Sequence, residues 1–330
     1  MAEKTSLYAL SSGIRQVGRL YDLEEPITKT GSVYRSGGAK AAILKPLQVG
    51  AAQAFAIARI LRQSQREFLP ELILPISVQR ARAGYLWHRG NRYLAARILP
   101  GRAADYFDDR DVAAAIRLMA SWHALTGAML RHDPQLQKLL AFDPVKCWEN
   151  RIRELDICRA MASRRSDEFS REYLARWPGF TDQANQALRE LQSRAGIAAP
   201  AVICYHDWAF HNVLIHGEKA FLIDFDYILA DTPVHDRANL LGRYLRLFHW
   251  APRSLLKMLR QFEAYYGWRR GEVGQLRVYL TFPYDYWMIG RQYFLEQQPW
   301  SERYFRDQWR RKIVAQEVRF QTLKILERLE

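Results

Sequence analysis

The spacing of apolar residues changes near residue 100, and this change constrains the fold more than any other feature of the chain. Before it, short runs of β-branched and aromatic residues alternate with turn residues around a single helical stretch. After it, long stretches carry apolar residues at helical spacing, and a strand-rich island interrupts them at residues 201–229. We therefore expect an α+β protein with a small β-rich N-terminal lobe and a larger helical C-terminal lobe.

The N-terminal lobe is expected to span residues 1–99 and to consist of an antiparallel sheet with one helix. Residues 32–46 predict a hairpin, because strand-forming residues flank the turn pair Gly37-Gly38. The stretch 48–65 predicts the helix, since its apolar residues recur at nearly helical spacing among alanines. Further strands are expected at residues 76–80, 84–88 and 92–99. A lobe junction is expected at residues 100–104.

The C-terminal lobe, residues 105–330, is expected to be mostly helical. A helix is predicted at residues 111–130, and further helical stretches at 146–195 are expected to break at the pair Pro178-Gly179. The run 300–312 interleaves aromatic residues with arginines. We interpret it as an amphipathic helix that buries its aromatic side chains, in preference to a surface that stacks nucleic-acid bases.

The strand-rich island holds the polar residues that point to chemistry. Asp207 and Asn212 lie five residues apart, and Asp224 closes an apolar strand twelve residues further on. Phosphoryl transfer from a nucleotide requires an acceptor for the proton of the substrate hydroxyl and oxygen ligands for Mg²⁺. A carboxylate on a loop before a hairpin, an amide at its start and a carboxylate after its second strand supply these groups.

The pattern Asp207-x4-Asn212, followed by Ile223-Asp224-Phe-Asp226, resembles the aminoglycoside phosphotransferase and choline kinase group within the protein-kinase-like fold. Within that group, the chain is more similar to the CotS-type spore-coat proteins. The segments that carry this second resemblance are 93–102, at the expected lobe junction, and 280–287, which reads Leu-Thr-Phe-Pro-Tyr-Asp-Tyr-Trp.

The resemblance implies a two-lobed protein-kinase-like fold and a role for each polar residue. Asp207 would be the catalytic base, and Asn212 and Asp224 would be the Mg²⁺ ligands. Asp226 has two interpretations, a residue that assists the metal or a cap of the following turn, and we favour the cap. Asp236 matches a family aspartate that braces the catalytic loop, so we interpret it as structural.

In the N-terminal lobe, the resemblance implies that Lys45 holds the α- and β-phosphates of ATP and that Gly31 belongs to the phosphate loop. Two departures from the family pattern stand out. No Asp or Glu occurs from residue 46 to residue 66, where a helix glutamate would pair with the lysine. The catalytic loop reads Tyr-His206-Asp207, where the group commonly has His-Gly-Asp.

These observations leave three hypotheses for function. The first is an ATP- and Mg²⁺-dependent phosphotransferase of the CotS-type group that transfers the γ-phosphoryl group to a hydroxyl acceptor of unknown identity. The second is a nucleotide-binding pseudokinase that acts as a structural spore-coat assembly protein, which the missing helix glutamate favours. The third, ranked last, is a nucleic-acid-binding protein driven by the net charge of +14, for which the sequence holds no recognised binding motif.

The remaining features bear on location and partners. The three cysteines, Cys147, Cys158 and Cys204, form no CxxC pair, which indicates reduced thiols rather than disulfides or a thiolate zinc site. No apolar run is long enough to span a membrane. We therefore expect a cytoplasmic protein, or a spore-coat protein if the resemblance holds, with a nucleotide, a hydroxyl acceptor and other spore-coat proteins as partners.

Overall fold

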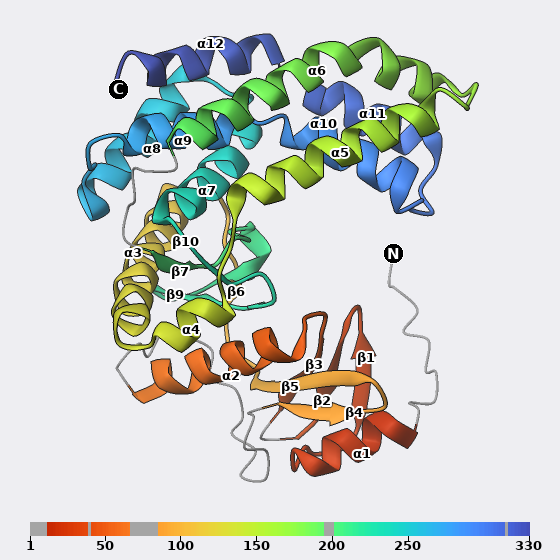
Figure 1. Cartoon of the computed structure of the whole chain (residues 1–330). Helices are drawn as coiled ribbons and strands as arrows, with labels where there is room; N and C mark the ends of the chain where they lie inside the picture. The colour runs from red at the N-terminus through yellow and green to blue at the C-terminus, as the bar shows by residue number, and fades with distance from the viewer. Residues whose placement is uncertain (1–11, 39–40, 67–84, 195–200, 314–315) are drawn as a thin grey trace. The chain divides into compact units, whose positions relative to one another are not determined.

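The computed structural model describes residues 12–38, 41–66, 85–194, 201–313 and 316–330 (Figure 1). Its contacts divide the chain into two compact units, and each is described by itself. The first unit takes in the chain up to residue 141 together with residues 209–230, and the second takes in residues 142–208 and 231–330. Residues 105–141 and 209–230 thus group with the N-terminal sheet, and the lobe junction expected at residues 100–104 stays a prediction.

The described residues form strands and helices in the order that the sequence pattern predicts, with a β-rich beginning and a mostly helical remainder. The strands are β1 (Ile27–Thr30), β2 (Val33–Ser36), β3 (Ala42–Leu47), β4 (Leu86–His88), β5 (Asn91–Arg97), β6 (Arg102–Ala103), β7 (Val202–Cys204), β8 (Val213–His216), β9 (Lys219–Leu222) and β10 (Leu229–Asp231). The helices are α1 (Ser12–Leu20), α2 (Ala51–Arg66), α3 (Asp109–His132), α4 (Pro134–Leu139), α5 (Pro144–Ala162), α6 (Glu168–Ser193), α7 (Pro233–Leu247), α8 (Pro252–Tyr266), α9 (Glu272–Thr281), α10 (Tyr284–Gly290), α11 (Glu302–Ile313) and α12 (Gln316–Glu327), with a 3₁₀ turn η1 (Phe210–Asn212) and a π-helical turn η2 (Arg291–Leu295).

An antiparallel sheet forms the N-terminal part of the first unit. Its strands lie in the order β1-β2-β3-β5-β4. The predicted hairpin is confirmed, because β2 and β3 pair with Tyr34 opposite Leu44. The strands predicted at residues 84–88 and 92–99 correspond to β4 and β5, whereas the strand predicted at 76–80 lies outside the described residues.

Two helices accompany this sheet, one more than the sequence analysis predicts. The additional helix, α1, buries Ile14 and Val17 against the sheet residues Ile27 and Leu44. Just after α1, the Tyr21 hydroxyl donates a hydrogen bond to the Tyr93 carbonyl at 2.6 Å. The predicted helix is α2, which begins at residue 51, three residues later than expected.

A second sheet in the first unit has three strands in the order β6-β8-β9. Asn212 lies just before β8, and Asp224 lies just after β9. β8 and β9 form a hairpin in which Val213 lies opposite Leu222. β6 pairs with the other edge of β8, and Arg102 on β6 forms an ion pair with the buried Asp111 of α3. α3 begins at residue 109, where the Asp108 carboxylate caps its first turn by accepting from the Arg110 N–H.

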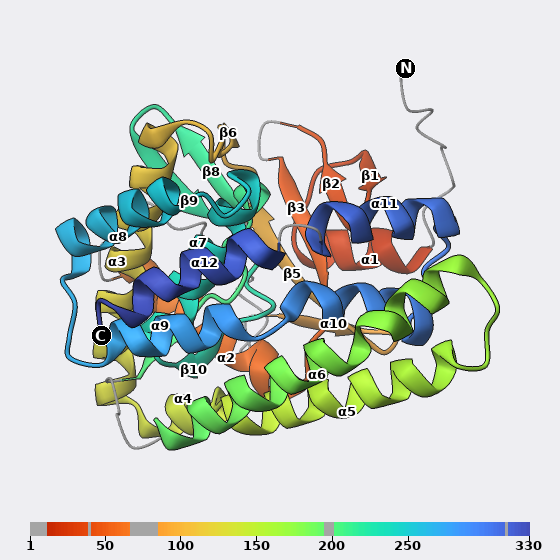
Figure 2. The ribbon, with the colours of Figure 1, turned by 90° about the horizontal axis from the view of Figure 1, so that it is seen from above.

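The second unit is mostly helical, and α5 and α6 lie side by side along its length (Figure 2). The break predicted at Pro178-Gly179 is wrong, because α6 continues through Pro178 as one helix of 26 residues. Proline removes one N–H from a helix and does not always end it. Tyr173 and Phe180, one on each side of the proline, are both buried against Tyr286 and stack on its ring.

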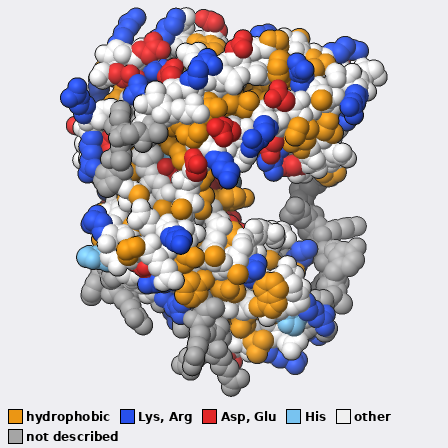
Figure 3. Space-filling view, viewed as in Figure 1, with side chains coloured by type: hydrophobic (Ala, Val, Ile, Leu, Met, Phe, Trp, Pro, Cys, Tyr) orange, Lys and Arg blue, Asp and Glu red, His pale blue; other side chains and the backbone are white. Residues whose placement is uncertain are grey.

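The arginine-rich run at residues 300–312 forms α11, and the predicted amphipathic helix is confirmed. Phe305 and Trp309 are buried in the second unit, where both rings pack against Phe169. On the face drawn in Figure 3, Lys and Arg side chains are interspersed with acidic and apolar ones and form no continuous basic surface. Among the described helices, none has the combination of length and apolarity needed to cross a membrane.

Candidate active site

The first unit brings Lys45 into contact with two carboxylates. Lys45 lies on β3 opposite Leu94 of β5, which fixes its position in the middle of the sheet. Its Nζ atom forms ion pairs with Asp224 Oδ1 and, at 2.9 Å, with Asp226 Oδ2. The lysine therefore has anionic partners in this structure, although no carboxylate precedes it on α2.

Asn212 and Asp224 lie at the same end of the β8–β9 hairpin. Asn212 ends η1 immediately before β8, and its carbonyl accepts the N–H of Ile223, which follows β9, at 3.0 Å. Asp224 then adopts φ = +70°, a left-handed conformation that a non-glycine residue rarely adopts. The chain turns sharply there, and the Asp224 carboxylate reaches Lys45 while remaining 39% exposed.

Asp226 does not cap the following turn, which corrects the interpretation from the sequence. Its carboxylate is buried and contacts Lys45 instead. Burial raises the pKa of Asp226, and the positive charge of Lys45 only partly opposes that rise. Asp226 Oδ1 is buried and has no hydrogen-bond partner of ordinary geometry among the described residues.

A glutamine of α2 takes the place of the expected helix acid. Gln53 Nε2 donates to the backbone carbonyls of Asp226, at 3.1 Å, and of Ile228, at 3.4 Å. A neutral amide suits this position, because carbonyl oxygens accept hydrogen bonds and would repel a carboxylate. Gln53 thus ties α2 to the segment that carries both partners of Lys45.

Gly31 lies in the two-residue turn of the β1–β2 hairpin, between the paired residues Thr30 and Val33. Its φ of +58° explains the glycine, and a Cβ atom at this position would meet no other atom within 4 Å. The open space leaves room for a ligand at the hairpin tip, and the phosphate-loop role of Gly31 stays a prediction.

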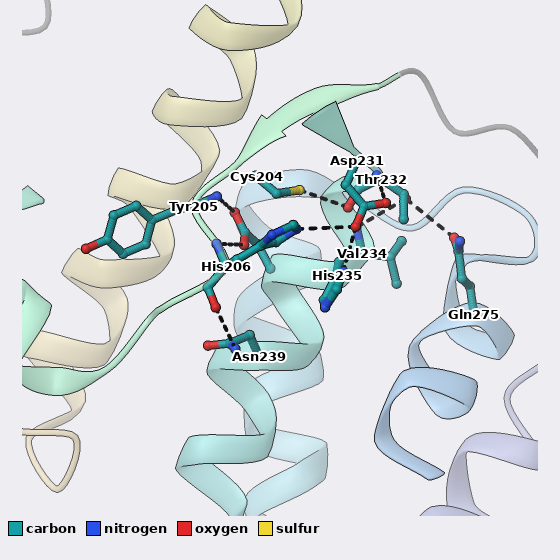
Figure 4. A network of polar contacts seen from close by, with 10 residues as sticks. Cys204, Tyr205, His206, Asp231, Thr232, Val234, His235, Asn239 and Gln275 are labelled. Atoms are coloured by element: carbon teal, nitrogen blue, oxygen red, sulfur yellow. Dashed lines mark hydrogen bonds and ion pairs between the residues drawn. The ribbon is translucent and has the colours of Figure 1, made fainter. Parts of the chain in front are cut away.

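In the second unit, Asp207 directly follows Tyr205 and His206, and Figure 4 shows these two residues on a loop beside α7. The buried Asp236 carboxylate accepts the N–H groups of Tyr205 and His206, each at 2.7 Å. Asn239, one turn further along α7, accepts the Trp208 N–H at 3.0 Å and donates to the His206 carbonyl at 2.9 Å. The structural role expected for Asp236 is confirmed.

The Asp207 carboxylate forms an ion pair with Arg243, which the sequence analysis does not identify. Arg243 Nε also donates to Asn239 Oδ1 at 3.0 Å. Asp236, Asn239 and Arg243 follow the helical spacing i, i+3, i+7, so they lie on one face of α7. This spacing is the signal that would have added Asn239 and Arg243 to the site.

His206 occupies the position at which the resembled group commonly has glycine. The backbone conformation at this position explains why glycine is preferred there. Its φ of +63° lies in the left-handed region, which costs an ordinary residue roughly 1 kcal/mol. Side-chain contacts accompany this conformation: His206 Nε2 lies 3.3 Å from Asp231 Oδ2, and its ring lies edge-on to Phe142. Asp231 Oδ2 also lies 2.6 Å from His235 Nδ1.

The donor atoms of the first unit fit a magnesium ion. Asn212 and Asp224 offer an amide and a carboxylate oxygen, the hard ligands that Mg²⁺ prefers. The unsatisfied Oδ1 atom of Asp226 adds a buried oxygen on a carboxylate that shares Lys45 with Asp224. No thiol or imidazole belongs to this set, which would instead favour zinc. A lysine adjacent to such oxygens is suited to bind phosphate groups.

Known proteins share a sequence pattern and the fold with this chain. The family model described as APH, phosphotransferase enzyme family, matches residues 32–273. No curated protein matches the chain. Among solved structures, an aminoglycoside phosphotransferase from Alicyclobacillus acidocaldarius is similar with a TM-score of 0.76 at 20% identity, covering 96% of this chain and 95% of its own.

Two further solved structures share the fold. The spectinomycin phosphotransferase APH(9)-Ia, in complex with ADP and spectinomycin, has a TM-score of 0.63 at 13% identity and covers 94% of this chain and 98% of its own. The choline kinase LicA from Streptococcus pneumoniae has a TM-score of 0.55 at 12% identity and covers 94% of this chain and 97% of its own. The protein-kinase-like α+β fold is therefore confirmed.

Proposed function

The chain belongs to the phosphotransferase enzyme family, and we propose that it transfers the γ-phosphoryl group of ATP to a hydroxyl acceptor with the help of Mg²⁺. The observation that carries this proposal is the contact of Lys45 with Asp224 and Asp226 beside Asn212. This set combines a phosphate-binding cation with oxygen ligands for a metal ion.

Each residue has a distinct part in the proposed reaction. Lys45 would bind the α- and β-phosphates, and Gly31 would let the backbone approach them. Asn212 and Asp224 would hold Mg²⁺, which supplies neutralisation of the phosphate charge when it is bound with ATP. Asp207 would accept the proton of the acceptor hydroxyl. The oxygen of that hydroxyl would form a bond to the γ-phosphorus, while the bond from the γ-phosphorus to the β,γ-bridging oxygen breaks and ADP leaves.

Asp226 would keep Lys45 in place during this reaction. If Asp224 held the metal, Lys45 would retain one anionic neighbour in Asp226. Asp226 would thus supply the anionic partner that a helix glutamate provides elsewhere in the family. The pseudokinase alternative depends on the lack of such a partner. We therefore favour an active enzyme over a structural pseudokinase.

The finer assignment to the CotS-type spore-coat group is also a proposal. It is supported by the resemblance of the segments at residues 93–102 and 280–287. If it holds, extracts of purified spore coats from the source cells contain the protein, whereas a purely cytosolic distribution would contradict it.

Two substitutions test the proposed function. ATP should raise the melting temperature only when Mg²⁺ is present, because a ligand that binds the native state stabilises it. Asp224→Asn should abolish this gain. Asp207→Ala should leave ATP affinity within a few-fold and lower turnover by about 10²–10⁴-fold, the usual contribution of general-base catalysis.

Asp156→Ala is the matched control, since it removes an exposed carboxylate on α5 of the same unit as Asp207. It should leave both readouts unchanged. An unaltered ATP·Mg²⁺ shift in Asp224→Asn would remove Asp224 from the metal site. Equal turnover in wild type and Asp207→Ala would overturn the role of Asp207 as base.

A further inference from the structure

Arginines of α5 and α7 lie near the start of α10 in the second unit. Arg151 of α5 lies over the rings of Tyr284 and Trp287, at 5.4 and 4.6 Å from their centroids. Arg246 of α7 contacts Asp285, the residue that follows Tyr284. Arg243 lies close to one helical turn before Arg246 on the same helix. Arg151 and Arg246 therefore both lie at the start of α10, and we refer to Arg151, Arg243 and Arg246 as the arginine cluster.

This cluster of arginines reaches the proposed catalytic residue directly. Arg243 is the residue that forms the ion pair with Asp207. Arg246, close to one helical turn further along α7, lies 3.4 Å from the buried Asp285 carboxylate. The side chains of Arg243 and Arg246 are 31% and 32% exposed, so solvent and ligands can reach them. A group held by the cluster would therefore lie close to Asp207.

The carboxylates in contact with the cluster do not balance its charge. Among the described residues, Arg151 forms no ion pair, and its neighbours are aromatic rings. Arg243 contacts Asp207, and Arg246 contacts Asp285. Among the described residues, the three arginines of the cluster thus form ion pairs with two carboxylates, and an added anion would be attracted.

We propose that this cluster binds an anionic group of the phosphoryl acceptor, so that the acceptor is a small-molecule alcohol carrying a carboxylate or a phosphate. The inference rests on the proposed function, because it assigns the acceptor for the same Asp207. Guanidinium groups match the geometry of both anions and can bind them through paired hydrogen bonds. The rings of Tyr284 and Trp287 provide an adjoining surface for the carbon skeleton.

The same charges disfavour a cationic acceptor. Choline and aminoglycosides are positively charged at neutral pH, and placing such a group beside three guanidinium groups would be repulsive. The anionic group takes no part in bond making. It orients the acceptor so that the hydroxyl lies at Asp207, and the transfer itself proceeds as described above.

The experiment uses two sets of acceptors that differ in charge but share a carbon skeleton. The first set is glycerol 3-phosphate, glycerate, glycerol and 3-amino-1,2-propanediol, and the second is glucose 6-phosphate, gluconate, glucose and glucosamine. ADP formation is measured with each compound, and binding of each compound without nucleotide is measured by calorimetry at constant ionic strength. We expect the anionic members of at least one set to exceed the neutral and cationic ones by about tenfold or more. The better of the phosphate and carboxylate members identifies the anion.

Variants connect this preference to the cluster. Arg151→Gln and Arg246→Gln should each lower kcat/KM and affinity for the anionic compounds by about tenfold or more, since one charged hydrogen bond is lost. They should leave KM for ATP nearly unchanged. Arg159→Gln is the matched control, because it removes the same charge from an exposed arginine of α5 that lies over Trp177. It should behave like the wild type.

Each other outcome has a definite meaning. Preference for neutral or cationic members, or anion binding that Arg151→Gln and Arg246→Gln do not weaken, overturns the inference. So does an equal loss of ATP affinity in these variants, which would assign the arginines to the nucleotide. If no anionic compound binds but ATP with Mg²⁺ still raises the melting temperature, the inference is overturned and the proposed function stands. Arginine-dependent anion binding without ATP binding or turnover supports the anion site and overturns the proposed function.

Discussion

At the scale of single residues, the candidate site is defined by charges that satisfy one another at close range. Lys45 bridges Asp224 and Asp226, and Arg243 holds Asp207. Asp226 is the least expected of these residues, because it is a buried carboxylate whose burial is only partly offset by its lysine partner. Such a residue costs stability in the fold, which favours a functional reason for its presence.

Asp226→Asn separates the contribution of this carboxylate to turnover from its contribution to stability. Asn keeps the shape of the side chain but removes the charge, so Lys45 loses one anionic partner. We expect turnover with ATP to fall by about tenfold, in line with the loss of one charged hydrogen bond. The melting temperature without ligand should stay level or rise, because burial disfavours the charged form of this carboxyl group at neutral pH.

Steady-state kinetics and thermal unfolding of the same preparation give both readouts. Glu218→Gln, which neutralises an exposed carboxylate in the β8–β9 turn, is the control and should alter neither. A clear drop in melting temperature with unchanged kinetics would show that Asp226 serves the fold alone.

At the scale of elements, the first turns of α7 fix the loop of Asp207. Asp236 and Asn239 together satisfy four backbone groups of residues 205–208, and Asn239 accepts a further bond from Arg243. The strand end before α7 contributes Asp231, which contacts both His206 and His235. The loop that carries the proposed base is therefore held by one helix and the segment that leads into it.

The contacts of Asp231 with His206 and His235 predict that the stability of the fold depends on pH. Burial lowers the pKa of His235, and the positive charge of a protonated His206 would lower it further, against the opposing effect of Asp231. Burial alone would raise the pKa of Asp231, but the interactions with His235 and His206 outweigh it and hold that pKa below its usual range. In both cases the unfolded chain binds its proton at a higher pH than the folded protein does.

The free energy of unfolding should therefore decrease as pH falls below about 6.5, where unfolded histidine takes up a proton, and further below about 4, where unfolded aspartate does. Denaturant unfolding between pH 5 and 7.5 measures the first part, with a slope of at most about 1.4 kcal/mol per pH unit for one proton. His235→Gln should flatten this slope, whereas His132→Gln, at an exposed histidine of α3, should not. An equal slope in wild type and His235→Gln would contradict the prediction.

At the scale of the whole molecule, the net charge of +14 does not by itself indicate a nucleic-acid partner. Many of the arginines in the described residues form ion pairs or lie over aromatic rings, as Arg306 does with Glu168 and Arg159 does with Trp177. Of the four aromatic residues in the run 300–312, Phe305 and Trp309 are buried, whereas Trp300 and Tyr304 are exposed. The nucleic-acid hypothesis thus loses two of the four rings that could have stacked on bases.

We expect only weak binding to random duplex DNA at physiological salt, with Kd about 10⁻⁴–10⁻⁶ M, as for proteins that contact phosphates without reading sequence. Fluorescence anisotropy at 50 and 200 mM salt measures this affinity, and it should fall steeply over that range as counterions compete. Tight binding that persists at the higher salt and depends on sequence would contradict the assignment to a phosphotransferase alone.

The amino-acid sequence was enough to predict the class of fold and the order of most elements, and it singled out Asp207, Asn212 and Asp224 as candidate site residues. The elements follow from local rules, because hydrophobic spacing sets helices and strands. It missed α1 and wrongly ended α6 at Pro178, since packing against the rest of a unit can stabilise a short helix or carry one through a proline.

Which charges meet depends on the tertiary structure. The contact of Lys45 with Asp224 joins residues 179 positions apart, and Asp207 and Arg243 are 36 positions apart. No local spacing fixes such pairs, because the paths of the intervening strands and helices determine where each side chain arrives. The sequence shows that α2 lacks an acidic residue to pair with Lys45. The contact of Asp226 with Lys45 could not be predicted in the same way, because it depends on how the chain folds.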